Sequence, residues 1–181
     1  MTEEIIIAGF GGQGVLSLGK ILAYSGLMQG QEVSWMPSYG PEQRGGTANV
    51  TVILSDEPIS SPVLSFYDTV IVLNQPSLDR FESKVKSGGT LIFDSNGISR
   101  FPERNDINIY RIDATEYALA QNSTKMLNMI ILGGLLKIRP LVSIENVLKG
   151  LKKSLPERHH HLLGVNEKAI YAGAELIQKV N

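Results

Sequence analysis

The sequence predicts an α/β fold: an open, mostly parallel sheet flanked by helices, with a helical C-terminal third. Short β-branched runs alternate with helical patterns as far as residue 112, and from Ala114 onward apolar residues recur at helical spacing. The first apolar run, 5–9, is continuous rather than alternating, which is typical of a strand covered on both faces. A chain of 181 residues suits one well-buried core, so a single domain spanning 1–181 is expected.

The predicted strands are short and rich in β-branched residues, and Gly88-Gly89 is predicted as a turn before the fifth of them. With right-handed crossovers as the default, the arrangement is Rossmann-like, and ligands or partners are expected at the carboxyl ends of the strands. The strands are predicted at 5–9, 32–36, 48–54, 69–73, 90–93 and 106–112.

Helices are predicted after the first strand, at 76–86, at 126–138, from an N-cap at Ser143, and along an apolar stripe from Ala169 to Val180. The first of these presents a face of small residues that would allow close contact with the sheet. The helix at 126–138 is apolar around most of its circumference, so we expect it to be buried or, alternatively, to form a partner-binding surface. The small face of the first helix consists of Gly19, Ala23 and Gly26.

Composition excludes several classes of function. Lys plus Arg (17) nearly balance Asp plus Glu (18), so no long-range field attracts nucleic acid or anionic lipid. The absence of cysteine excludes disulfides, zinc–thiolate sites, thiol nucleophiles and cysteine-ligated clusters. No apolar run approaches the roughly 20 residues that span a bilayer, and the acidic N-terminus does not resemble a signal peptide, so a cytoplasmic protein is expected.

The first glycine-rich loop has the pattern Gly9-x-Gly11-x-x-Gly14 between a predicted strand and a helix, which is the context of a dinucleotide fingerprint. The acidic ribose ligand expected at the end of the second strand is missing, because Met36-Pro37-Ser38 stands there. An anion site at the helix start and a purely structural tight turn both remain open. Gln13 could use its amide toward a ligand or toward the backbone.

The second candidate loop, 36–47, is predicted to be ordered, because two prolines fix backbone torsions and its glycines permit unusual ones. Arg44 could hold a carboxylate or phosphate in a bidentate manner, or could form an ion pair with Glu42 that braces the loop. Tyr39 could contact a partner or cap the core. Both loops follow predicted strands and are therefore expected at the same edge of the sheet.

The three histidines, 159–161, do not predict a metal site, because consecutive residues do not share one face and no cysteine assists them. Their confinement to one place also excludes a legible Ser-His-Asp constellation. Asn128, within the apolar helix, could bond across an interface or satisfy a nearby carbonyl.

Four sequence elements together resemble the gamma subunit of 2-oxoacid:ferredoxin oxidoreductases, and the resemblance runs nearly end to end. Subunits of the 2-oxoglutarate and 2-oxoisovalerate enzymes are the most similar, with 2-oxoglutarate favoured, and those of pyruvate enzymes compete closely. The elements are Gly9-Phe-Gly-Gly-Gln-Gly14, Ser38-Tyr-Gly-Pro-Glu-Gln-Arg-Gly-Gly46, Asn128-Met with Leu132-Gly133, and Asn166-x-x-Ala169-x-x-x-Gly173.

The resemblance implies one subunit of a complex that decarboxylates a 2-oxoacid, transfers the acyl group to coenzyme A and reduces ferredoxin. It implies alpha, beta and delta-type partners, which would carry thiamine diphosphate, magnesium and the iron–sulfur clusters. A subunit inactive alone, and self-associating when isolated, is expected. The alternatives are a freestanding nucleotide-binding or regulatory module and a pure scaffold. The residues implied at the active site or an interface are Gly11, Gly12, Gln13, Gly14, Ser38, Tyr39, Gly40, Glu42, Arg44, Gly45 and Gly46, with Asn128 and Asn166 as structural or interface residues.

Overall fold

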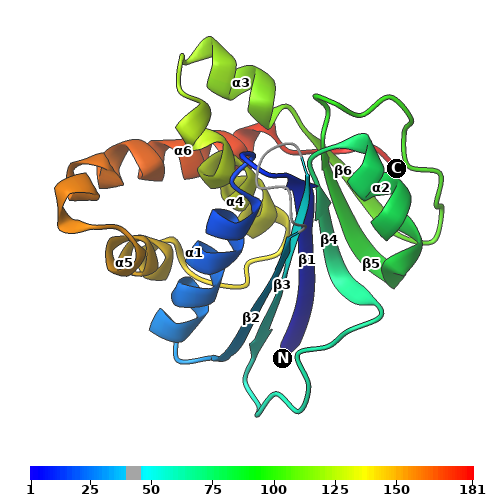
Figure 1. The fold of residues 1–181 in the computed structure, drawn as a ribbon, viewed down its shortest axis with the longest axis horizontal. Helices are drawn as coiled ribbons and strands as arrows, with labels where there is room; N and C mark the ends of the chain where they lie inside the picture. Colours follow the sequence, from blue (N-terminus) through cyan, green and yellow to red (C-terminus); the bar gives the residue numbers. More distant parts are fainter. Residues whose placement is uncertain (40–45) are drawn as a thin grey trace.

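The computed structural model describes residues 1–39 and 46–181, with the backbone alone at Tyr39. Its centre is a seven-stranded sheet in the order β2-β3-β1-β4-β5-β6-β7 (Figure 1). The strands are β1 Thr2–Phe10, β2 Glu32–Tyr39, β3 Thr47–Ser55, β4 Tyr67–Val72, β5 Val85–Asp94, β6 Asn108–Ile112 and β7 Gln178–Lys179.

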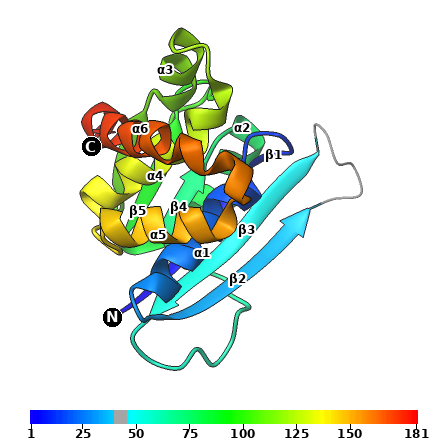
Figure 2. The same ribbon diagram turned by 90° about the vertical axis from the view of Figure 1, so that its left-hand side faces the viewer.

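The directions of the strands confirm the predicted fold class. Strands β1, β4, β5 and β6 pair in parallel, while β3 is antiparallel to both β1 and β2, and β7 is antiparallel to β6. Strands β1, β2, β4, β5 and β6 therefore point one way. Strand β3 lies between β1 and β2, and β2 and β3 form the outer hairpin in Figure 2.

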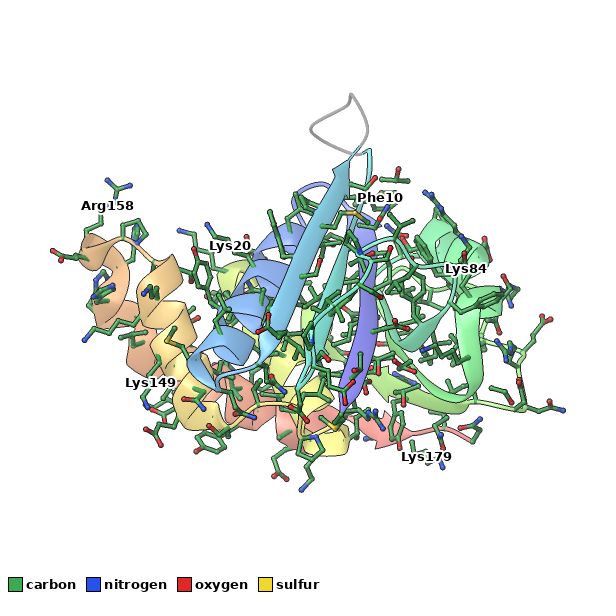
Figure 3. All side chains as sticks on the ribbon, turned by 90° about the horizontal axis from the view of Figure 1, so that it is seen from below. Phe10, Lys20, Lys84, Lys149, Arg158 and Lys179 are labelled. Atoms are coloured by element: carbon green, nitrogen blue, oxygen red, sulfur yellow. The ribbon has the colours of Figure 1, made fainter. Side chains whose placement is uncertain are left out.

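Helices cover both faces of the sheet. One face carries α1, α3, α4, α5 and α6, and the other carries α2 (Figures 1 and 2). Figure 3 shows Lys20 of α1 and Lys84, which follows α2, on opposite sides of the sheet. Among the described residues, no helix has both the length and the apolar character to cross a bilayer. The helices are α1 Val15–Met28, α2 Gln75–Phe81, α3 Ala114–Ala120, α4 Leu127–Ile138, α5 Ile144–Ser154 and α6 Leu163–Leu176, with short 3-10 helices at Glu82–Lys84, Thr124–Met126 and Glu157–Leu162.

Helix α1 contacts the sheet through its predicted small face. A Cβ atom added to Gly19 would lie 2.5 Å from Val50 Cγ1, and one added to Gly26 would lie 2.6 Å from Leu54 Cδ2. A larger side chain at either glycine would prevent this approach, so the small face lets α1 pack closely on β3.

Helix α4 is buried, and the alternative that it forms an exposed partner-binding surface is wrong. Its residues from Met129 to Leu136 are all buried. The reason is a close crossing with α6, in which a Cβ atom on Gly133 would lie 1.8 Å from Ile170 O and one on Gly173 would lie 1.8 Å from Ile130 O.

Three predicted element boundaries are wrong. The last helix ends at Leu176 rather than continuing to Val180, because the chain turns into β7 and Val180 N donates to Ile109 O at 2.9 Å. Gly88-Gly89 lies inside β5, where a register shift absorbs the φ of +76° at Gly88. The helix expected at 76–86 ends early, since Val85 already belongs to β5.

Candidate functional site

The first glycine-rich loop joins the end of β1 to the start of α1. Gly12 and Gly14 have φ values of +97° and +77°, a conformation that side-chain-bearing residues rarely adopt. Gly14 occupies the N-cap position of α1, and within the described part of the chain no side chain caps this helix start. The first backbone N–H groups of α1 are therefore available to an anion, which the helix dipole favours there.

The first candidate loop and the described C-terminal end of the second, Gly46 and Thr47, meet at one edge of the sheet. Phe10, the last residue of β1, pairs with Thr47, the first residue of β3. Beyond this pair, Gly11 N donates to Gly46 O at 2.9 Å. The glycine-rich loop is thus fastened to the base of the β2–β3 hairpin.

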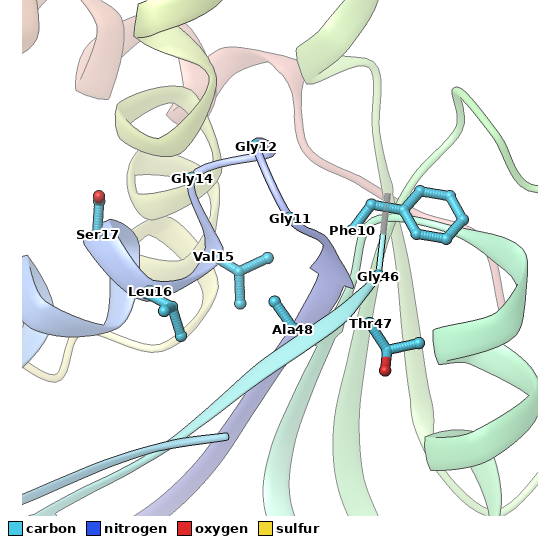
Figure 4. Close-up of a pocket in the computed structure, with 10 residues that line it drawn as sticks. All are labelled: Phe10, Gly11, Gly12, Gly14, Val15, Leu16, Ser17, Gly46, Thr47 and Ala48. Atoms are coloured by element: carbon cyan, nitrogen blue, oxygen red, sulfur yellow. The ribbon is translucent and has the colours of Figure 1, made fainter. Parts of the chain in front are cut away.

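A cavity of about 550 Å³ lies between these segments (Figure 4). It combines backbone at glycines, the first turn of α1 with Ser17, Thr47 at the start of β3, and an apolar wall. Figure 4 shows the side chains of Val15 and Ala48 directed toward one another beneath the loop. Its size and mixed lining suit a ligand with both an anionic and an apolar part. The lining residues are Phe10, Gly11, Gly12, Gly14, Val15, Leu16, Ser17, Gly46, Thr47 and Ala48.

Gln13 directs its side chain to the backbone, one of the two roles left open by the sequence. Its Oε1 accepts from Phe10 N at 2.6 Å, and its Nε2 donates to Leu73 O at 3.1 Å. The amide therefore ties the loop to the ends of β1 and β4 and does not line the cavity.

Of the two candidate asparagines, the structure brings only Asn128 to the loop. A Cβ atom on Gly14 would lie 3.6 Å from Asn128 Cβ, so α4 supports the loop from behind. Asn128 Oδ1 accepts from Met129 N at 3.0 Å. Asn166 instead donates from Nδ2 to Leu162 O at 2.9 Å at the start of α6, which is a local structural contact.

Several predicted residues cannot be placed at the cavity. Ser38 is exposed near the end of β2, opposite Asn49 of β3. Only the backbone of Tyr39, at the end of β2, is described. The remaining predictions lie outside the described residues: Gly40, Glu42, Arg44 and Gly45.

Sequence reasoning missed Phe10, Ser17 and Thr47. Ser17 follows Gly14 by three residues, so helical phase could have placed it in the first turn beside the loop. Phe10 and Thr47 meet only through the β1–β3 register, for which the sequence offered no local signal.

Two carboxylates lie farther along the same edge, at the ends of β5 and β6. Burial raises the pKa of Asp94, against hydrogen bonds from the Thr115 hydroxyl and from the backbone N–H groups of Asn96 and Thr115. Burial alone would also raise the pKa of Asp113, but hydrogen bonds from Ser95 and Arg111 hold it below its ordinary value. Both carboxylates thus accept hydrogen bonds from neighbouring residues of this chain.

The histidine run forms part of a 3-10 helix between α5 and α6. His160 Nε2 lies 2.9 Å from Lys152 O and 3.0 Å from Leu155 O, so its ring binds the C-terminal end of α5. Within residues 1–39 and 46–181, no group of three or more His, Cys, Asp or Glu side chains is placed to hold a metal ion.

Comparison with known proteins gives a consistent result. Residues 4–176 match the family model described as pyruvate ferredoxin/flavodoxin oxidoreductase. The chain is 35% identical to the 2-oxoglutarate synthase subunit KorC of Methanothermobacter marburgensis, covering 99% of this chain and 98% of KorC. It is 34% identical to the ketoisovalerate oxidoreductase subunit VorA of the same organism, covering 97% of this chain but only 37% of VorA.

Solved structures show the same fold. The gamma subunit of a keto/oxoacid ferredoxin oxidoreductase from Geobacter sulfurreducens aligns with a TM-score of 0.82 and 29% identity, covering 97% of this chain and 96% of that one. A 2-oxoglutarate:ferredoxin oxidoreductase from Magnetococcus marinus, solved with 2-oxoglutarate, coenzyme A and succinyl-CoA bound, aligns with a TM-score of 0.86 and 24% identity. That alignment covers 97% of this chain and 31% of the longer one.

Proposed function

The chain belongs to the pyruvate ferredoxin/flavodoxin oxidoreductase family, and from this premise we propose that it is the gamma-type subunit of a 2-oxoacid:ferredoxin oxidoreductase. The complex would decarboxylate a 2-oxoacid oxidatively, form an acyl-CoA and reduce ferredoxin, with alpha, beta and delta-type subunits as partners. The nearly full-length match to KorC and the similarity to a solved gamma subunit support this proposal over a freestanding nucleotide-binding module.

We propose 2-oxoglutarate as the 2-oxoacid. Identity alone does not separate the KorC and VorA relatives, which are 35% and 34% identical to this chain. The extent of the match favours KorC, because it covers 98% of KorC, whereas the chain spans about a third of VorA. If the purified complex turned over 2-oxoisovalerate or pyruvate faster than 2-oxoglutarate, the assignment of 2-oxoglutarate would be wrong.

The cavity beside the glycine-rich loop carries the proposal for this chain's own role, which is to bind part of coenzyme A. The Magnetococcus marinus protein binds coenzyme A. In this chain, the backbone N–H groups of the loop and of the first turn of α1 suit the phosphates. Val15 and Leu16 provide an apolar wall for the less polar arm.

Thiamine diphosphate, magnesium and the iron–sulfur clusters are assigned to the partner chains. Because the sequence contains no cysteine, this chain offers no thiolate ligand for a cluster. Thiamine diphosphate and magnesium are placed on the partners because the resemblance to the family implies it. The contribution of Arg44 to coenzyme A or to subunit contact, the cytoplasmic location and self-association of the isolated chain stay predictions.

Ser17 offers a direct test, because it is exposed and lines the cavity in the first turn of α1. In the purified complex, Ser17→Glu should raise the KM for coenzyme A about tenfold, since a carboxylate a few ångströms from a phosphate is repelled by about 1.4 kcal/mol. A carboxylate suits a helix start, so folding and assembly should not suffer.

Ser17→Gln is the matched neutral control and should change this KM much less. Equal KM values for the Glu and Gln variants would show that no anionic part of coenzyme A lies at this cavity.

A further inference from the structure

The hydrogen bonds between β1 and β4 are interrupted at their carboxyl ends in a specific way. The regular pairing ends at Ala8 and Val72, and Leu73 N then donates to Ala8 O at 2.9 Å. In a parallel ladder the next bond would run from Phe10 N to Leu73 O. Instead, Phe10 N donates to Gln13 Oε1 at 2.6 Å, and Gln13 Nε2 donates to Leu73 O at 3.1 Å. The carboxamide of Gln13 stands inside this last rung.

Only an amide can fill this position, because the rung needs one acceptor and one donor on the same planar group. The bond from Gln13 N to Phe10 O, at 3.2 Å, closes a ring that fixes the turn between the two residues. Gly9 makes room for the inserted group, since a Cβ atom there would lie 2.7 Å from Gln13 Oε1. The glycines and the glutamine of the loop are therefore parts of one arrangement.

We infer that Gln13 is a positioning residue: by splitting the last β1–β4 rung, its carboxamide holds the Gly11–Gly14 backbone in the shape that binds coenzyme A. This inference rests on the proposed function. Without the amide, we expect the strand ends to move together until Phe10 N bonds Leu73 O, as in a regular parallel ladder. Loss of the amide should therefore reshape the loop while the fold survives.

The experiment compares Gln13→Ala with a matched variant at the other end of α1. Gln29 makes an equivalent bridge, donating from Nε2 to Leu141 O at 3.1 Å and accepting from Ser143 N at 2.7 Å at Oε1, and it does not line the cavity. In the purified complex, Gln13→Ala should raise the KM for coenzyme A about tenfold, the effect of about one lost hydrogen bond to a charged group.

The unfolding midpoint of the full chain supplies the second readout. Gln13→Ala should change the unfolding midpoint little, because Phe10 N and Leu73 O are expected to bond each other in the variant. Gln29→Ala should lower it, because no backbone bond replaces its bridge, and should leave the KM for coenzyme A unchanged. Gln13→Glu keeps the acceptor for Phe10 N but loses the donor for Leu73 O, so it should also raise this KM.

The outcomes separate this inference from the proposed function. A parental KM for coenzyme A in both Gln13 variants, with a midpoint lowered as in Gln29→Ala, would make Gln13 purely structural and overturn the inference. If Ser17→Glu raises this KM and the Gln13 variants do not, the cavity binds coenzyme A and only the role of Gln13 is wrong. If Ser17→Glu also has no effect, the proposed site itself is wrong.

Discussion

At the scale of the residue, Asp94 is a buried carboxylic acid at the C-terminal end of β5. The residue is 1% exposed, and its carboxylate accepts from Thr115 N at 3.2 Å and from Asn96 N at 3.3 Å. These bonds compensate only part of the lost hydration, so burial raises its pKa above the ordinary value of 3.8. Folding therefore shifts the protonation equilibrium of Asp94 toward the protonated form relative to the unfolded chain.

This raised pKa predicts a pH dependence of stability. The contribution of Asp94 is fully present below pH 3.8 and is lost as the pH rises through its raised folded-state pKa. Asp94→Asn removes the titration, so the variant should gain stability relative to the parent as the pH rises above 3.8 and through the raised folded-state pKa. Urea unfolding at a series of pH values measures the difference.

Asp79→Asn is the control, because the pKa of Asp79 is shifted in the opposite direction from that of Asp94. Hydrogen bonds from Gln75 and Arg100 lower the pKa of the exposed Asp79, so its contribution is present above pH 3.8 and is lost as the pH falls through the lowered value. If the unfolding free energies of the parent and Asp94→Asn changed in parallel with pH, Asp94 would not have a raised pKa in the folded chain.

At the scale of the element, the α4–α6 crossing depends on two glycines that let the backbones touch. Gly133→Ala should destabilise the chain by about 1–3 kcal/mol or more, because the new methyl group meets the carbonyl of Ile170 and the helices must separate. Gly164 of α6 has no heavy atom within 4 Å of an added Cβ, so Gly164→Ala should keep or slightly increase stability. Urea unfolding measures both free energies, and equal losses would argue against the tight crossing.

The elements that sequence reasoning predicted well are those specified locally. Helix α1 follows from its apolar period and its small face, and each β-branched run became a strand. The place of β2 beyond β3 and the pairing of β7 with β6 depend on contacts distant in sequence. A two-residue strand such as β7 also has no period that a sequence can reveal.

The residues of the candidate site also divide into those specified by a short segment and those that depend on distant contacts. The glycine-rich turn and its edge of the sheet were predictable, because left-handed glycines and strand direction are properties of a short segment. Phe10 and Thr47 were not, since they meet only through register. The contact of Gln13 with Leu73 spans 60 residues, so the sequence could leave its role open but could not decide it.

At the scale of the whole molecule, one sheet separates two apolar clusters. The larger lies under α1, α3, α4, α5 and α6, and the smaller lies under α2. Successive residues of β1, β4 and β5 point alternately into the larger and the smaller cluster. Unfolding of these strands would therefore expose both clusters at once. This sharing supports the single domain over 1–181, which stays a prediction.

A single domain predicts one cooperative transition, and the only tryptophan provides the probe. Trp35 lies on the α1 side of β2, in a groove with Ala23 and Leu27, whereas Leu91 is fully buried under α2. Leu91→Ala should destabilise the chain by about 2–5 kcal/mol. Because both faces unfold together, the midpoint followed by Trp35 fluorescence should fall as far as the midpoint followed by circular dichroism. A Trp35 transition that stays in place while the dichroism shifts would divide the chain into two units.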